Sequence, residues 1–167
     1  STSGVFLALY GPRTFFPLGA QSKKQTAVSH STAESEIVAL DHGLRTEGLP
    51  SVPLWSVLLG RNPVLNLYVD NQATMTIVKT GKAPTLRYIG RTHAVSIAWL
   101  HERTLDAKII LSDCNTDFMS ADIFTKAFTS KEKWLHVSKL VGLLDTAACA
   151  RLLQPQARAA SAAVLCC

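Results

Sequence analysis

The chain has 167 residues, of which 47% are apolar, and this is enough to bury one substantial hydrophobic core. Its 17 Lys and Arg exceed its 12 Asp and Glu, and the resulting net charge of +5 permits a polyanionic partner without requiring one. No apolar run approaches the roughly 18 residues of a membrane span, and the four cysteines show neither a CxxC pair nor a Cys/His zinc pattern. We therefore expect an intracellular protein with one domain over residues 1–144 and a tail over 145–167.

The first predicted elements are the two strands of a hairpin and two helical segments. They cover residues 4–10, 14–22, about 31–48 and 54–59. The strands are short apolar runs on either side of Gly11-Pro12, a pattern typical of an antiparallel hairpin. The helical segments are expected to be separate because Pro50 and Pro53 lie between them.

The rest of the chain is predicted to add two strands and further helices. The strands cover residues 64–69 and 107–112, and the helices cover the residues up to Gly81 and about 88–104, 116–128 and 131–144. From Asp145 onward the composition shifts to Ala, Gln and Arg without a clear amphipathic period. We interpret this tail as frayed helix or disorder.

Two glutamates near the start of the first helix are predicted to have different roles. Ser31 and Glu34 have the spacing of a capping box, in which the Ser31 hydroxyl accepts from the third helical amide and Glu34 reaches back to the N–H of the cap. Glu34 therefore has a structural explanation. Glu36 lies beside the apolar stripe of the helix, so its carboxylate needs another partner, and a metal ion is one candidate.

Glu36 is one of three acids at comparable positions, together with Asp70 at a strand end and Asp122 in a later predicted helix. Each has a plainer explanation. Glu36 and Asp122 can be solvated residues at the edge of an apolar stripe, and Asp70 can cap the helix that follows it. If the three converge, their oxygens suit two magnesium ions about 3.5–4 Å apart, which promote hydrolysis of a phosphodiester. Without metal such a cluster would repel itself, so it is a poor structural device.

Four sequence blocks resemble successive parts of the ribonuclease H domain at the end of copia-type retrotransposon pol polyproteins. They are STSGVFLALYGPRTFFPLGAQSKKQTAVSHSTAESEIVAL, LYVDNQATMTIV, LRYIGRTHAVSIAWLHE and NTDFMSADIFTKAF. The resemblance covers residues 1 to about 143. Its most specific parts are SKKQ with the STAESE helix, VDNQA and ADIFTK.

The resemblance implies an α/β fold of the ribonuclease H type, with a mixed sheet flanked by helices. It implies hydrolysis of the RNA strand of an RNA–DNA hybrid with two Mg²⁺ ions, for which Mn²⁺ can substitute. Carried over by motif, catalysis and metal binding fall to Glu36, Asp70 and Asp122. The expected partners are the hybrid and a reverse transcriptase linked covalently in the parent polyprotein, and no membrane is involved.

Contacts to the hybrid are expected from basic and polar side chains beside the first helix and in the predicted helix at 88–104. These residues are Lys23, Lys24, Gln25, Arg87, Arg91 and His93. They could contact phosphates without reading bases, and an ordinary solvated surface is the alternative.

The chain departs from the family pattern at its start. The first strand of the family, with its first metal-binding aspartate, lies upstream of the STSG block, and no acid before Glu34 can replace that aspartate. The sheet is therefore expected to lack this strand and to expose an edge beside residues 4–10. Two hypotheses follow: a ribonuclease H domain that is active in its complete form, and an inactive remnant that binds nucleic acid or serves as a structural domain. For these 167 residues alone we expect inactivity.

Overall fold

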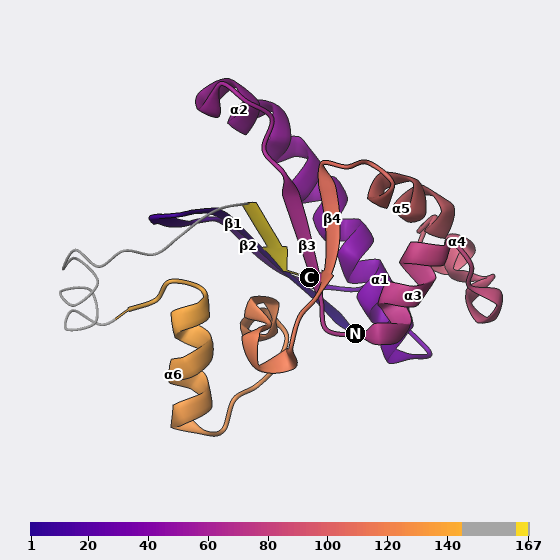
Figure 1. Ribbon diagram of the computed structural model, residues 1–167. Coiled ribbons are helices and arrows are strands. Elements are labelled where there is room, and N and C mark those ends of the chain that lie inside the picture. The colour runs from indigo at the N-terminus through magenta and orange to yellow at the C-terminus, as the bar shows by residue number, and fades with distance from the viewer. Residues whose placement is uncertain (145–162, 167) are drawn as a thin grey trace.

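A five-stranded mixed sheet lies at the centre of this α/β protein (Figure 1). The computed structural model describes residues 1–144 and 163–166. The strands are β1 (Thr2–Gly11), β2 (Thr14–Lys24), β3 (Leu65–Val69), β4 (Ile109–Asp113) and β5 (Ala163–Cys166), in the order β2-β1-β5-β3-β4. β1 and β2 form an antiparallel hairpin, whereas β3 and β4 are parallel. β5 joins the two halves, because it pairs antiparallel with β1 and parallel with β3.

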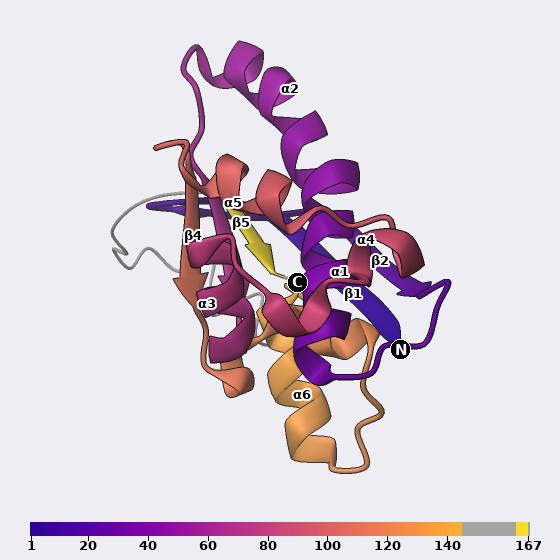
Figure 2. The ribbon, with the colours of Figure 1, turned by 90° about the vertical axis from the view of Figure 1, so that its right-hand side faces the viewer.

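Helical segments cover both faces of the sheet (Figures 1 and 2). They are α1 (Thr32–Gly43), the π turn η1 (Leu44–Gly48), α2 (Leu49–Leu59), α3 (Gln72–Thr80), η2 (Pro84–Leu86), α4 (Ile89–Thr92), α5 (Ile97–Thr104), η3 (Thr116–Phe118), η4 (Ser120–Phe124) and α6 (Lys131–Leu140). α1, α3 and α5 pack on one face, and η4 and α6 lie on the other. None of the described helices combines the length and the apolar content needed to cross a bilayer.

Side chains of β1 point alternately to the two faces of the sheet and contribute to a hydrophobic core on each. Val5 and Leu7 face α1 and α3, in a core that also contains Ile37, Leu40, Leu67 and Val78. Phe6 and Ala8 face the opposite side, where they pack against Met119 and Ala121. Successive side chains of a strand point to opposite faces, so this fully apolar run predicts a strand covered on both sides.

The predicted hairpin is confirmed by β1 and β2, with an irregularity that the sequence explains. The register shifts between Leu7 and Ala8, which pair with Gly19 and Pro17, so Leu18 is the extra residue of a β-bulge. Pro17 lies beside this bulge on an edge strand, where its missing N–H breaks no interior ladder.

The prediction that prolines divide the first helix is wrong. α1, η1 and α2 follow one another directly, and α2 carries the chain away from the sheet in both views (Figures 1 and 2). Leu49 N–H donates to Leu44 O across the π turn, and Pro50 falls in the first turn of α2, where a helix can dispense with an N–H. α2 has no buried residue.

Two further predicted helices are interrupted. The segment 88–104 forms α4 and α5, because Ala94 has a φ of 56° and Ser96 starts α5 by accepting from Trp99 N–H. The segment 116–128 forms η3 and η4, separated by the extended residue Met119. Asn115 accepts from Asp117 N–H there, and such local side-chain bonds favour short turns over a regular helix.

The predicted tail differs at its end. Ala163–Cys166 form β5, not frayed helix, whereas residues 145–162 and 167 lie outside the described residues. β5 pairs with Phe6–Ala8 of β1, where we expected an exposed edge. The edge strands of the described sheet are β2 and β4.

Candidate acidic site

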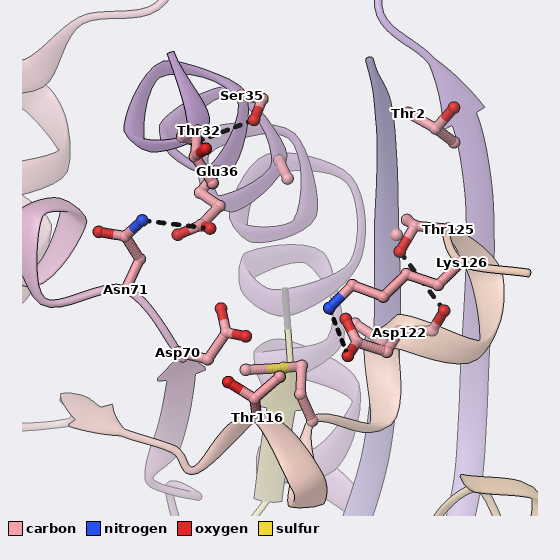
Figure 3. A pocket seen from close by; sticks show the side chains of 14 residues that line it. Thr2, Thr32, Ser35, Glu36, Asp70, Asn71, Thr116, Asp122, Thr125 and Lys126 are labelled. Atoms are coloured by element: carbon pink, nitrogen blue, oxygen red, sulfur yellow. Dashed lines mark hydrogen bonds and ion pairs between the residues drawn. The ribbon is translucent and has the colours of Figure 1, made fainter. Parts of the chain in front are cut away.

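A cavity of ≈ 470 Å³ is lined by residues from β1, α1, the end of β3 and η4 (Figure 3). The three predicted acids, Glu36, Asp70 and Asp122, all line it. Lys126 does so as well, and its amino group points toward the acids in Figure 3. The fold thus brings three carboxylates from distant parts of the sequence to one opening.

Asp70 reaches the cavity because it directly follows β3 and does not cap the next helix. The N-cap of α3 is Asn71, whose Oδ1 accepts from Ala73 N–H at 2.8 Å and from Thr74 N–H at 3.1 Å. The capping explanation for Asp70 therefore does not hold. Its carboxylate remains directed toward Glu36 and Asp122, as Figure 3 shows.

Glu36 projects from α1 toward the end of β3. Its Oε1 accepts from Asn71 Nδ2 at 3.3 Å, and its Oε2 accepts from Thr74 Oγ1 at 3.2 Å. Burial raises the pKa of Glu36 above its ordinary value, and the nearby charge of Asp70 raises it further, while the two hydrogen bonds partly oppose the shift. This half-buried carboxylate is thus less easily ionised than an ordinary glutamate.

Asp122 enters the cavity from the opposite face of the sheet. Its side chain is 15% exposed, and its Oδ2 lies 2.7 Å from Lys126 Nζ. Burial raises the pKa of Asp122, Lys126 opposes that shift, and Asp70 adds to it. Asp122 and Glu36 therefore share a physical situation, in which desolvation and the charge of Asp70 disfavour the ionised form.

Glu34 takes no part in the cavity. Ser31 Oγ accepts from Glu34 N–H, as predicted, but the Glu34 carboxylate accepts from His30 N–H and not from the N–H of the cap. It also accepts from Tyr88 OH and contacts His93 Nε2, and the whole side chain is buried. The capping box is therefore one part of a larger buried network.

The cavity offers the oxygen donors that Mg²⁺ prefers, together with open space for water and substrate. As they stand, no three His, Cys, Asp or Glu side chains among residues 1–144 are grouped closely enough to hold one metal ion. Glu36 is bonded to Asn71 and Thr74, and Asp122 is bonded to Lys126. To share a cation, these carboxylates would have to turn away from such partners toward a common point.

The residues predicted to contact nucleic acid fall into two groups. Lys23, Lys24, Arg87 and Arg91 are exposed. Gln25 instead donates to Ser3 Oγ and Ser35 O. The structure does not support a phosphate contact by His93, because its side chain is 1% exposed and lies against Glu34 at 3.1 Å.

Two cavity residues were missed from the sequence: Asn71, which holds Glu36, and Lys126, which holds Asp122. The buried Thr74, which also donates to Glu36, was missed as well. The spacing of Lys126 four residues after Asp122 is a usable signal for an ion pair. The contacts of Asn71 and Thr74 to Glu36 join α3 to α1 and have no signal in the local sequence.

Comparison with models of protein families, with curated proteins and with solved structures finds no match to this chain.

Proposed function

We propose that the protein is a ribonuclease H domain of a copia-type retrotransposon pol polyprotein, linked covalently to a reverse transcriptase in the parent polyprotein. Its complete form would hydrolyse the RNA strand of RNA–DNA hybrids with magnesium. The observation that carries the proposal is the cavity shared by Glu36, Asp70 and Asp122. These acids come from separate blocks of the sequence, with gaps of 34 and 52 residues between them.

The sheet is compatible with this proposal. An antiparallel hairpin lies on one side and a parallel pair on the other, with helices on both faces, as expected of a ribonuclease H-like fold. Asp70 lies at the carboxyl end of β3, beside the turn into α3. In open α/β sheets, ligands bind near the carboxyl ends of the strands.

Glu36, Asp70 and Asp122 would hold the magnesium, with Mn²⁺ as a substitute. The bound ions supply charge stabilisation for the attacking and leaving oxygens of the phosphodiester. Asn71 and Thr74 would orient Glu36 through the hydrogen bonds that they already make. The exposed Lys23, Lys24, Arg87 and Arg91 would contact phosphates, while duplex shape and 2′-hydroxyl groups identify the RNA strand.

A second candidate function is an inactive domain that only binds nucleic acid or packs within a larger protein. β5 favours it, because this strand pairs with Phe6–Ala8 on the side of β1 where the resemblance places the upstream strand and its aspartate. With that position taken, three acids line the cavity among the residues that the structure describes.

Cleavage of a labelled RNA–DNA hybrid tests the two candidates. The 167-residue protein and a protein extended upstream through its parent reading frame would each be assayed with and without Mg²⁺. We expect magnesium-dependent cutting of the RNA strand by the extended protein and its loss in Asp70→Asn. Asp106→Asn is a matched control, because Asp106 is an exposed aspartate that does not line the cavity.

Two results would contradict the nuclease proposal: no cutting by the extended protein, or cutting that survives Asp70→Asn. Salt-dependent binding of the hybrid without cleavage would support the inactive domain instead.

A further inference from the structure

Among the residues that the structure describes, Lys126 is the one cationic side chain that lines the acidic cavity. Its backbone N–H donates to Asp122 O at 2.9 Å, so the residue lies one turn beyond Asp122 and its side chain folds back over it. Nζ then donates to Asp122 Oδ2 at 2.7 Å. Figure 3 shows the amino group inside the opening, between Asp122 and the side that carries Glu36.

The charge of Lys126 acts on more than one acid. It opposes the rise in the pKa of Asp122 and also lowers that of Glu36, against the effects of burial and of Asp70. Three carboxylates that repel one another are therefore partly neutralised by a cation that belongs to the chain. A divalent ion bound by the same carboxylates would meet that cation in the same space.

We propose that Lys126 is a built-in counter-ion of the cavity, whose amino group competes with divalent cations for Asp122 and so sets the cation affinity of the site. This inference rests on the proposed function, since it concerns regulation of the same metal site.

The ion pair is suited to reversible competition. The Lys126 side chain is 49% exposed, so its amino group can leave Asp122 and be hydrated at small cost. The side chain is also long and flexible, and its backbone turn can stay in place while the amino group swings outward. Asp122 itself is largely buried, so its side chain should move little when one cation replaces the other.

Binding of Mg²⁺ to the 167-residue protein, measured by calorimetry at constant ionic strength, tests the inference. Lys126→Met removes the charge and keeps much of the apolar stem, and we expect it to bind Mg²⁺ about five-fold more tightly, the factor for an ion pair of about 1 kcal/mol. Lys126→Arg keeps a cation and is expected to stay near the wild-type affinity. Lys79→Met is the matched control, because it removes an exposed charge outside the cavity.

A second readout follows the lysine directly. In NMR spectra, the side-chain signals of Lys126 should move during the Mg²⁺ titration of the wild-type protein, while those of Lys79 should not. Thermal unfolding without Mg²⁺ verifies that the variants are folded, and Lys126→Gln replaces Lys126→Met if that protein fails to fold.

The outcomes separate this inference from the nuclease proposal. Unchanged or weaker Mg²⁺ binding by Lys126→Met overturns the competition, even if the extended protein cleaves hybrid. Tighter binding by Lys126→Met with no cleavage supports the competition and contradicts the nuclease. Absence of Mg²⁺ binding in all of these proteins overturns the competition and the proposed metal site together.

Discussion

Glu34 and Glu36 lie two residues apart on α1, yet they belong to opposite kinds of polar cluster. Glu34 is fully buried, and its carboxylate is served by His30 N–H at 2.7 Å, Tyr88 OH at 3.0 Å and His93 Nε2 at 3.1 Å. Glu36 faces a cavity that it shares with two other acids. A fully buried acid among several donors has a sufficient structural role, whereas an acid beside other acids at an open cavity is a candidate for binding a ligand.

The two glutamates also differ in the direction of their pKa shifts. Burial alone would raise the pKa of Glu34, but the hydrogen bonds from His30 and Tyr88, together with the charge of His93, bring it below its ordinary value of 4.5. For Glu36, burial and Asp70 win over its hydrogen bonds, and the pKa is raised. Ionised Glu34 therefore stabilises the folded state, and ionised Glu36 weakens it.

The largest effect on the free energy of unfolding is expected from Glu34→Gln, which should be destabilised. The amide offers one acceptor oxygen where the carboxylate offers two, so it cannot accept from His30 N–H, Tyr88 OH and His93 Nε2 together. Leaving a buried donor without its partner costs about 3 kcal/mol when that partner was a charged group. Urea unfolding at neutral pH measures the change. Glu36→Gln is the matched control on the same helix, and equal losses in the two variants would erase the distinction between the clusters.

Deletion of residues 163–167 should act on the cavity and spare the Glu34 network. β5 is the strand that pairs with both β1 and β3, and Asp70 follows β3 directly. Loss of this short strand breaks its pairing with β1 and with β3, and it is expected to cost at least about 2 kcal/mol, at a net value of about 1 kcal/mol for each hydrogen bond.

NMR separates the two clusters in that deletion. The amide signals of Asp70 and Asn71 should move strongly, while those of Tyr88 and His93 should keep their positions. Movement of both sets to the same extent would mean that β5 supports the whole fold and not the cavity in particular.

Much of the framework could be predicted from the sequence, because its signals are local. Apolar runs bounded by Gly and Pro identify the hairpin, Gly81 ends α3 with a φ of 67°, and Ser31 caps α1. The acids at the cavity also had local signals, since Asp70 follows an apolar strand at once.

The errors lie where distant residues decide the structure. His93 was predicted to contact phosphates, but its side chain is buried against Glu34, which lies 59 residues earlier in the chain. β5 takes its partners from β1 and β3, so a short apolar stretch in an alanine-rich tail gave no local sign of pairing. The single helix predicted over 116–128 was also wrong, because the Asn115 side chain accepts from Asp117 N–H and favours the short turns η3 and η4.

Glu36→Gln is expected to raise the free energy of unfolding slightly, whereas Glu34→Gln lowers it. The amide removes a carboxylate whose ionised form is disfavoured by burial and by Asp70, while its oxygen can still accept from Asn71 or Thr74. Because the group is half exposed, the gain in stability at neutral pH should be only about 0.5 kcal/mol. Addition of Mg²⁺ should stabilise the wild-type protein more than this variant, and equal stabilisation would remove Glu36 from the metal site.

The smallest effect concerns how stability changes with pH, and here the two glutamates should give opposite slopes. The pKa of Glu36 is raised in the folded state, so between that value and 4.5 the folded protein binds more protons than the unfolded chain, and acidification stabilises it. The pKa of Glu34 is lowered, so from about 4.5 downward the unfolded chain binds more protons, and the stability contributed by Glu34 is lost as the pH falls through its folded value.

Urea unfolding at several pH values should therefore show two separable changes. Relative to the wild-type protein, Glu36→Gln should lack the gain in the free energy of unfolding that the wild type shows in weakly acidic solution, a difference of about 0.5 kcal/mol. In Glu34→Gln, the fall in the free energy of unfolding that Glu34 causes at lower pH should be absent. Because each variant is compared with the wild type at the same pH, other carboxylates such as Asp41, whose pKa is also raised, contribute equally to both proteins and cancel. Slopes of the same sign for the two glutamates would contradict the assignment of one to the protein's interior and the other to a ligand site.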